Sequence, residues 1–590
     1  MWTILYELFE DIMFNLPFIK NKQVSILPNK NGKKPIVLLV LDGWGIAPPS
    51  KGNPISRAKT PNFNAIYANY PHGQLIASGE SVGLPANEVG NSEVGHLTIG
   101  VGKVILQSLK RINVAIEEGT FYENNAFTSA IAHVRQYKSK LHLMGLISSG
   151  SVHASADHFN ALLEFCRRSE LNNVCIHIFT DGRDAPPKEA YNLIKGIEKN
   201  IDNLKIGKIA TITGRYYAMD RDMRWSRTQR AYEAIVAGKG LTASSPEEAI
   251  KNAYIKGQTD EFIEPTVIVH PGNNKCTVDD DDAVIFFNFR VDRPRQLTMA
   301  FVLADFENLK SFEIGHEPGE GKKEGYVYSG STFKRIKWPK NLYFVTMTEY
   351  QEKIPVSAIA YPPIKASTSL PEVLAKQGKK QLHLTESEKE RMVTIYFNGL
   401  HGDRFPGEDD LILPSPKVST YDKKPEMNVF KIVEEFKKAL TKNIYDFVVM
   451  NFANPDMVAH SGSIKATIKA IEYVDKAVGE VVQTILAYDG TLFITADHGN
   501  AEELISFPTT SFFFTTSKGN INTDHSNNPV PFLIIANRFY HKPFELTKGN
   551  LSDVAPTILS YMSLPIPLSM AGKNLLVDLK NTATLESRMN

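Results

Sequence analysis

Short apolar runs bounded by turn residues recur along the chain. They are Ile36–Leu41, Ala283–Phe289, Phe447–Phe452, Leu492–Ala496 and Phe532–Ile535. Runs of this length without alternating polar residues are typical of strands that are buried on both faces of a parallel sheet. We therefore predict a strand at each run and a parallel sheet built from them.

Helical patterns lie among these runs. They predict helices over Phe430–Lys442 and Ile464–Leu486. Ser552 followed by Asp553 is typical of a helix N-terminus and predicts a helix that continues toward Met562. Because predicted strands and helices alternate, the sequence indicates the α/β class.

The composition is that of a folded protein without a strong overall charge. At about 100–200 residues per domain, the 590 residues suggest roughly two to four domains. Hydrophobic residues make up 42% and charged residues 22%, which excludes a disordered chain. The 66 basic and 65 acidic residues leave a formal charge of +1, so no net field attracts nucleic acid or an anionic membrane. We expect neither as a partner.

The cysteines and the N-terminus indicate a cytoplasmic protein. Cys166, Cys175 and Cys276 are odd in number and form no C-x-x-C pair, which argues against a disulfide framework or a thiolate zinc site. Met1–Lys20 is apolar, but acidic residues interrupt it and no basic segment precedes it, so it is neither a signal peptide nor a membrane span. An amphipathic helix, an added arm and a misassigned start codon all fit it.

Three polar or irregular segments stand apart from the predicted elements. Gly315–Arg335 and Phe507–Asn522 are expected to be surface excursions, and the phenylalanines of the second are expected to pack against the protein. Asp279–Asp282 precedes a predicted strand, and we interpret it as a solvated turn and not as a metal site.

Acidic residues and a histidine follow three of the predicted strands. They are Asp42, Asp456, Asp497 and His498. Ligands of open parallel sheets bind outside the carboxyl ends of the strands, so these side chains are expected to converge on one crevice. Each residue alone also fits a turn, a helix cap or a hydrogen-bonded histidine. Together they indicate a hydrolase or transferase site.

Two further histidines complete a metal-type pattern. His460 lies four residues after Asp456, which on a helix places their Cβ atoms about 5–6 Å apart on one face. His525 is another candidate. A mixed set of carboxylates and imidazoles suits manganese first, and also zinc, cobalt or iron, better than calcium.

Ser92 is the candidate nucleophile. It lies in Gly90–His96, where neighbouring glycines allow the backbone to bring the hydroxyl close to a metal ion. A bound cation would lower the pKa of that hydroxyl and remove the need for a histidine base. A helix N-cap role for Ser92 is the alternative.

Arginines gather in a different part of the chain. They occur in Asp181–Asp184, Gly214–Asp222 and Asn288–Arg293. One guanidinium group can donate two parallel hydrogen bonds to a phosphate or a carboxylate, so these segments predict a receptor for a small dianion. Salt bridges with the neighbouring aspartates are the alternative, although Arg290 ends an apolar run, which argues against an exposed pair there.

Taken together, these motifs closely resemble the 2,3-bisphosphoglycerate-independent phosphoglycerate mutases, glycolytic members of the alkaline phosphatase superfamily. The resemblance runs from about Lys34 to about Gly572. The segments that carry it are Leu41–Gly45, Gly90–His96, Asp181–Asp184, Gly214–Arg221, Asn451–Val458 and Ala496–Asn500.

The resemblance implies an alkaline-phosphatase-like parallel-sheet domain with a second α/β transferase domain inserted into it. The expected boundaries are 1–33 for an N-terminal extension, 34–106 and 341–590 for the phosphatase-like domain, and 107–340 for the inserted phosphotransferase domain. A monomer is expected.

The resemblance also implies two divalent metal ions, with manganese preferred and zinc, cobalt, iron or magnesium as alternatives. One ion would be held by Asp42, Ser92, Asp497 and His498, and the other by Asp456, His460 and His525. The implied substrate-binding residues are His153, Arg183, Asp184, Arg215, Arg221, Arg290, Arg293 and Lys389.

The implied reaction converts 3-phosphoglycerate to 2-phosphoglycerate through a phosphoserine. Ser92 would take the phosphoryl group, Lys389 would stabilise its charge, and Asp184, with Arg183 nearby, would accept the proton of the attacking glycerate hydroxyl. A metal-dependent phosphomonoesterase or another phosphomutase is the alternative activity, and a catalytically silent binding module is a third reading.

Three segments depart from the family pattern. Ser149 and Ser151 stand where an aspartate and a glycine are usual, 397–401 lacks the usual second glycine, and 522–524 replaces a turn entered by threonine and alanine before His525.

Overall fold

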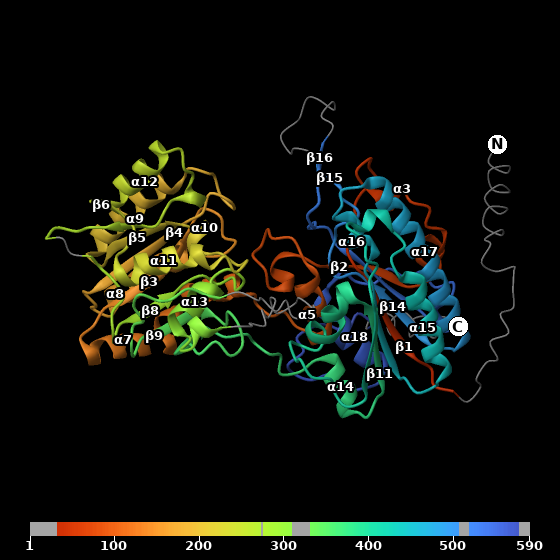
Figure 1. Cartoon of the computed structure of the whole chain (residues 1–590). Helices are drawn as coiled ribbons and strands as arrows, with labels where there is room; N and C mark the ends of the chain where they lie inside the picture. Colours follow the sequence, from red (N-terminus) through yellow and green to blue (C-terminus); the bar gives the residue numbers. More distant parts are fainter. Residues whose placement is uncertain (1–31, 273–274, 310–330, 507–518, 577–590) are drawn as a thin grey trace. The chain divides into compact units, whose positions relative to one another are not determined.

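The chain folds into two units, which are described separately (Figure 1). The computed structural model describes residues 32–272, 275–309, 331–506 and 519–576. Nearly all of the N-terminal extension, and most of the two expected excursions at Gly315–Arg335 and Phe507–Asn522, lie outside the described residues. No helix within these ranges is long and apolar enough to cross a membrane.

The first unit runs to Ile105 and resumes at Lys365. Its main sheet has the strand order β12-β11-β13-β1-β14-β17-β2-β18. The strands in that order are Glu408–Leu413, Gln381–Glu386, Phe447–Phe452, Ile36–Leu41, Thr491–Thr495, Val530–Ile535, His72–Ile76 and Gly549–Asn550. The strands from β12 to β14 are parallel, which confirms the prediction for the apolar runs that form β13, β1 and β14; β11 and β12 were not predicted.

The prediction of a parallel strand at Phe532–Ile535 is wrong in direction. This run forms β17, which pairs antiparallel with both β14 and β2. All six of its residues are buried, so an apolar run reports burial on both faces and not strand direction.

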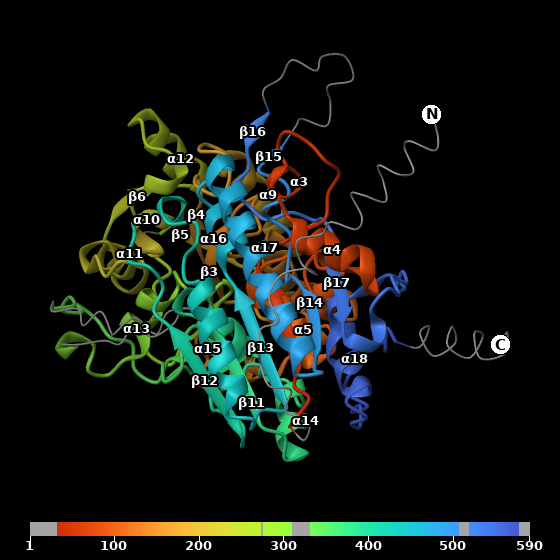
Figure 2. The same ribbon diagram turned by 90° about the vertical axis from the view of Figure 1, so that its right-hand side faces the viewer.

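Helices cover both faces of this sheet. Helices α15 (Val429–Thr441) and α17 (Ile464–Ala487) lie over one face, and α5 (Ser92–Val101), α14 (Leu370–Lys376) and α18 (Val554–Tyr561) lie over the other (Figures 1 and 2). The helix predicted from Ser552 begins later, at Val554, because Asn550 caps a preceding short turn and exchanges hydrogen bonds with Asp553.

The second unit, Leu106–Ile364, has a sheet of its own with the order β10-β9-β8-β3-β4-β5-β7-β6. The strands in that order are Ala358–Tyr361, Tyr343–Thr348, Ala283–Phe286, Leu141–Ile147, Val174–Thr180, Lys208–Gly214, Thr266–Ile268 and Leu241–Ala243. Only the pair β5–β7 is antiparallel among these named strands.

The expected domain boundary at residue 340 differs from the boundary in the structure. Residues 341–364 belong to the second unit, because β9 pairs with β8 and β10 pairs with β9. Both strands extend the parallel part of the second sheet, so this unit ends at Ile364.

Two further sequence expectations fail in the second unit. Cys175 on β4 and Cys276 form a disulfide, although their number and spacing argued against one. The fold brings together cysteines 101 residues apart, and such a pairing leaves no local motif. Asp279–Asp282 is not a fully solvated turn, because Asp282 is buried and lies 3.0 Å from Nε2 of His142.

A buried histidine makes the second unit sensitive to acid. His158, on α8 (Ala156–Arg168), is fully buried, and Nε2 donates to Oδ1 of Asn113 at 2.8 Å. Burial lowers the pKa of this imidazole from 6.5 to about 4. Between these pH values the unfolded chain binds a proton that the folded chain excludes, so stability falls as the pH falls.

We predict that His158→Gln reduces this loss, because a neutral amide can keep the bond to Asn113 without titrating. The difference in the free energy of unfolding between pH 7.5 and pH 5 should shrink by about 2 kcal/mol. Urea unfolding followed at both pH values measures it. An equal loss in the wild type and the variant would contradict the prediction.

Candidate active site

The predicted strand-end residues of the first unit lie at neighbouring strand ends. Asp42 directly follows β1, Asp456 lies on α16 (Asn454–Ala459) after β13, and Asp497 and His498 follow β14. Since β1 lies between β13 and β14 in the sheet, these carboxyl ends are adjacent. All four side chains are buried.

Ser92, the first residue of α5, places its hydroxyl beside the strand-end residues Asp42 and His498. Asn91, not Ser92, is the N-cap residue, since its side chain accepts a hydrogen bond from the backbone N–H of Val94. Ser92 Oγ lies 3.3 Å from Oδ1 of Asp42 and 3.0 Å from Nε2 of His498. A Cβ atom on Gly95 would lie 2.4 Å from the carbonyl oxygen of Asp497, so only glycine allows this approach.

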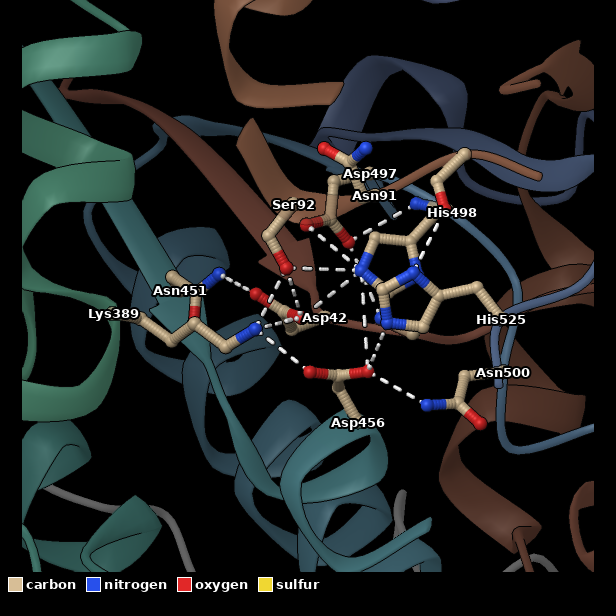
Figure 3. A network of polar contacts seen from close by, with 12 residues as sticks. Asp42, Asn91, Ser92, Lys389, Asn451, Asp456, Asp497, His498, Asn500 and His525 are labelled. Atoms are coloured by element: carbon tan, nitrogen blue, oxygen red, sulfur yellow. Dashed lines mark hydrogen bonds and ion pairs between the residues drawn. The ribbon is translucent and has the colours of Figure 1, made fainter. Parts of the chain in front are cut away.

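Lys389 provides the positive charge at the centre of this group. Its Nζ atom donates to Ser92 Oγ at 2.7 Å, to Asp42 Oδ1 at 2.7 Å and to Asp456 Oδ2 at 2.8 Å (Figure 3). Burial alone would lower the pKa of this amine, but the charges of Asp42, Asp456 and Asp497 raise it above its usual range. The lysine is therefore a fixed cation beside the serine.

A second cluster joins Asp456 to two histidines. Nε2 of His460 lies 3.2 Å, and Nε2 of His525 lies 3.4 Å, from Oδ1 of Asp456. Nδ1 of His460 contacts the carbonyl oxygen of Thr523 at 2.8 Å, and Nδ1 of His525 contacts that of Gly90 at 2.8 Å. A carbonyl only accepts, so each Nδ1 carries a proton.

The lone pairs of these two imidazoles consequently face each other. In the neutral tautomers both Nε2 atoms are unprotonated, yet they lie 3.2 Å apart beside a carboxylate oxygen. Such an arrangement of lone pairs is unfavourable unless a proton or a metal ion lies between them; despite burial, Asp456 raises the pKa of His460, and a divalent metal ion fits the same place. An Nδ1–H bond to a backbone carbonyl is a usual way of orienting a histidine ligand.

The pKa values of Asp497 and His498 are set by the charged groups around them. Burial alone would raise the pKa of Asp497, but His498, His96 and Lys389 lower it. Burial alone would lower the pKa of His498, but the carboxylates of Asp497, Asp42 and Asp456 raise it to about 9. The site thus concentrates negative charge that a cation would offset.

Among the described residues, three groups have ligand atoms within 4.8 Å of one another; one of them, His383, Glu408 and Asp410, does not include the residues above, and the other two lie here. They are Asp42, Asp497 and His498, and Asp456, His498 and His525. Carboxylate oxygens with imidazole nitrogens suit divalent transition metals.

Three side chains that the sequence analysis did not assign orient these ligands. Nδ2 of Asn451 donates to Asp42 Oδ2 at 2.7 Å, and Nδ2 of Asn500 donates to Asp456 Oδ1 at 2.8 Å. Nδ1 of His96 lies 3.1 Å from Asp497 Oδ2. All three lie within the motifs quoted above, but an amide or histidine that orients a ligand has no spacing signature of its own.

The arginine-rich segments come together in the second unit. His153 follows β3, Arg183 and Asp184 follow β4, Arg215 begins α10 (Arg215–Ala218) after β5, and Arg290 and Arg293 follow β8. These strands are neighbours in the order β8-β3-β4-β5, so the residues gather at one edge of this sheet. Arg221 is tied to them through Asp292, 2.7 Å away.

Arg215 is the buried centre of this group. Its Nη1 atom lies 2.6 Å from Asp181 and 2.5 Å from Asp184, and its Nη2 atom donates to Nε2 of His153 at 3.0 Å. Arg215, and not Arg183, is therefore the ion-pair partner of Asp184; Arg183 lies 3.6 Å from Glu261.

His153 is a neutral imidazole of defined tautomer. An arginine only donates, so Nε2 of His153 accepts and Nδ1 carries the proton. Burial, together with the charges of Arg215, Arg290 and Arg293, lowers its pKa to about 4 in spite of Asp292.

The outer arginines are more exposed than expected. The Arg290 side chain is 41% exposed and lies 3.2 Å from Asp292, so the argument from its apolar run was wrong: Phe289 is still buried, but the Arg290 side chain reaches solvent. Burial and the charges of Arg215 and Arg221 lower the pKa of Arg293, which shows a positive local field. An anion would relieve this crowding of cations.

The sequence departures leave both affected histidines in these groups. Ser149 donates through its backbone N–H and its Oγ to Glu189, at 2.9 and 2.6 Å, while His153 keeps its contact with Arg215. His525 reaches Asp456 in spite of the altered turn before it.

Fold and site define the class of protein: an α/β protein with carboxylate and imidazole side chains at the strand ends that could hold a divalent metal ion. Residues 112–352 match the family described as BPG-independent PGAM N-terminus, and residues 317–564 match the family described as Sulfatase.

Curated relatives extend these matches over most of the chain. A 2,3-bisphosphoglycerate-independent phosphoglycerate mutase of Clostridium beijerinckii is 44% identical, covering 92% of this chain and 99% of that protein. One of Chloroflexus aggregans is 46% identical, with the same coverage. A crystal structure of Leishmania mexicana phosphoglycerate mutase at low cobalt concentration matches with a TM-score of 0.62 and 27% identity, covering 93% of this chain and 98% of that one. The chain belongs to the 2,3-bisphosphoglycerate-independent phosphoglycerate mutase family.

We predict that His525→Ala removes one bound divalent ion per chain, because its Nε2 atom completes the cluster with Asp456 and His460. Titration calorimetry of metal-free protein with Mn²⁺ measures the stoichiometry. His541→Gln, at an exposed histidine of the same unit, is the control and should bind like the wild type. An unchanged stoichiometry in His525→Ala would contradict the assignment.

Proposed function

We propose that the chain interconverts 3-phosphoglycerate and 2-phosphoglycerate by intramolecular phosphoryl transfer, without a bisphosphoglycerate cofactor. Such an enzyme is an isomerase, like the relatives to which the chain is similar. The observation that carries the proposal is the placement of Ser92 Oγ, 2.7 Å from the amine of Lys389 and 3.0 Å from Nε2 of His498.

Two divalent ions would be held in the first unit, by two sets of residues. Asp42, Ser92, Asp497 and His498 would hold one, and Asp456, His460 and His525 the other. When bound, such ions lower the pKa of a coordinated hydroxyl and offset charge on a phosphoryl group. We propose manganese, with zinc, cobalt, iron and magnesium as alternatives.

The side chains of the first unit prepare Ser92 for attack on phosphorus. Its Oγ atom loses its proton and forms a bond to the phosphoryl group while the bond from phosphorus to the glycerate oxygen breaks. The departing oxygen gains a proton and becomes a glycerate hydroxyl, so the half-reaction releases no net proton. Lys389, held between Asp42 and Asp456, lies close enough to Ser92 Oγ to donate to a transferring phosphoryl oxygen. All three N–H donors of the lysine are in use, so the bond to Ser92 Oγ is the one that would be exchanged for the phosphoryl oxygen, while Asp42 and Asp456 keep the amine in place.

The arginine group of the second unit is proposed to hold the glycerate. Its guanidinium groups suit the carboxylate, and Arg215 holds Asp184 in place. In the second half-reaction the other glycerate hydroxyl attacks the phosphoserine. We propose that Asp184 takes the proton of that hydroxyl, while the bond between phosphorus and Ser92 Oγ breaks.

The remaining sequence expectations stay predictions. They are a cytoplasmic location, a monomeric state and the assignment of the phosphatase-like and transferase roles to separate domains.

We predict that Ser92→Ala abolishes the phosphoenzyme and lowers kcat by at least about a thousandfold, since no other hydroxyl replaces the acceptor. The measurement is conversion of 3-phosphoglycerate with Mn²⁺ and without bisphosphoglycerate, together with mass spectrometry of the trapped protein. Retention of most of the activity would refute the nucleophile, and release of inorganic phosphate by the wild type as the main product would favour a phosphomonoesterase.

We predict that Arg290→Ala impairs the mutase reaction at least tenfold more than the hydrolysis of p-nitrophenyl phosphate, because only the mutase substrate carries a carboxylate for this arginine. The two kcat/KM values measured on the same preparation decide it. Equal losses in both assays would contradict a role in glycerate binding.

A further inference from the structure

Glu502 is a buried carboxylate next to the metal-ligand segments, and none of the roles above uses it. Its side chain lies four residues after His498 and is only 2% exposed. Every hydrogen bond described for it comes from an uncharged donor. Among the described residues no ion pair offsets the charge of Glu502, and burying such a carboxylate is costly unless its hydrogen-bond donors are well placed.

Each oxygen of Glu502 binds a different part of the chain. Oε2 accepts from the backbone N–H of Gly45 at 3.0 Å and from that of Asn500 at 2.9 Å. Oε1 accepts from the hydroxyl of Ser526 and from Nδ2 of Asn528 at 3.0 Å. One side chain therefore joins its own segment to the segment of Ser526 and Asn528 and to Gly45, which lies 457 residues away in the sequence.

Each of these segments carries proposed metal ligands. Gly45 lies three residues after Asp42, Asn500 lies two residues after His498, and Ser526 directly follows His525. The last two segments also meet through the backbone, where the N–H of Ser526 donates to the carbonyl of Gly499 at 2.9 Å.

Two glycines show how closely the chain closes on this carboxylate. A Cβ atom on Gly45 would lie 2.3 Å from Cδ of Glu502. A Cβ atom on Gly499 would lie 2.5 Å from Oε1 of Glu502 and 2.3 Å from Oγ of Ser526. Any side chain at either position would push the segments away from Glu502, so both positions require glycine for this contact.

We propose that Glu502 is a positioning residue that sets the spacing between the two metal-ligand groups. Through Oε2 it fixes the segments of Asp42 and of Asp497 and His498, and through Oε1 it fixes the segment of His525. The inference rests on the metal centre proposed above. It adds the residue that holds the ligand-bearing segments at a fixed distance from one another.

The two oxygens of Glu502 accept from different kinds of donor, so the proposal predicts a specific effect of replacing one of them. In Glu502→Gln the amide oxygen has to face the backbone N–H groups of Gly45 and Asn500, because these donors cannot reverse. The amide nitrogen then faces Ser526 and Asn528, and the bond from Asn528 is lost. The variant should therefore loosen the segment of His525 and leave the segments of Asp42 and His498 in place.

The test is titration calorimetry of metal-free protein with Mn²⁺, combined with thermal unfolding and steady-state kinetics. For Glu502→Gln we expect one binding event to weaken roughly tenfold or more and the other to change less than about threefold. We expect the melting temperature of the metal-free protein to stay within about 3 °C of the wild type. We expect kcat at fixed Mn²⁺ to fall more than KM for 3-phosphoglycerate rises.

Two further variants keep the test decisive. Glu480→Gln removes the same charge from α17, where Glu480 is 45% exposed beside Lys437, and it should match the wild type throughout. Ser526→Ala deletes the hydroxyl contact to Oε1, together with the bond that this hydroxyl accepts from the backbone N–H of Asn528 at 3.2 Å, and should weaken the same binding event if Glu502→Gln does not fold.

The results separate this inference from the proposed function. Wild-type binding of both ions by Glu502→Gln, or weakening of both events together with a lower melting temperature of the metal-free protein, overturns the positioning role alone. A wild type that binds no divalent ion and does not form 2-phosphoglycerate overturns the proposed function and this inference with it.

Discussion

The crowding of three buried carboxylates around one hydroxyl is the constraint on which the site depends. Asp42, Asp456 and Asp497 are each at most 2% exposed, and their mutual repulsion is offset mainly by Lys389 and by the surrounding imidazoles. Burying such charges is favourable only with close, fixed partners. The adjacent carboxyl ends of β13, β1 and β14 supply that fixation, because each strand is held by parallel pairing along its length.

The second unit solves the opposite electrostatic problem. There the excess charge is positive. Asp181 forms an ion pair with Arg215, and Asp292 lies close to Arg221 and Arg290. His153 stays neutral in this field, so it orients Arg215 without adding to the positive charge. An anionic ligand would compete with these aspartates for the guanidinium groups, so binding would replace some Arg–Asp ion pairs with contacts to the ligand.

The sequence predicts most of this arrangement where local pattern and topology agree. The bounds of β1 and β13 match their apolar runs, and Asp456 and His460 lie together because a helix places residues four apart on one face. The direction of β17, the Cys175–Cys276 bond and the contacts of Glu502 depend on chain segments that meet only in the folded state. The spacing of residues along the sequence does not reveal such contacts. It does not reveal the exposure of the Arg290 side chain either.

The pairing of β1 has a consequence for how the chain is made. Its two partners in the sheet, β13 and β14, lie more than 400 residues further along the chain. At about 5–20 residues per second, synthesis delivers them roughly 20–80 seconds after β1 has emerged. During that interval an apolar strand without neighbours is exposed to aggregation, while the second unit, whose strands are all translated in between, can complete its own sheet. Completion of the first sheet, and with it of the strand ends that carry Asp42, Asp456 and Asp497, therefore waits for nearly the whole polypeptide.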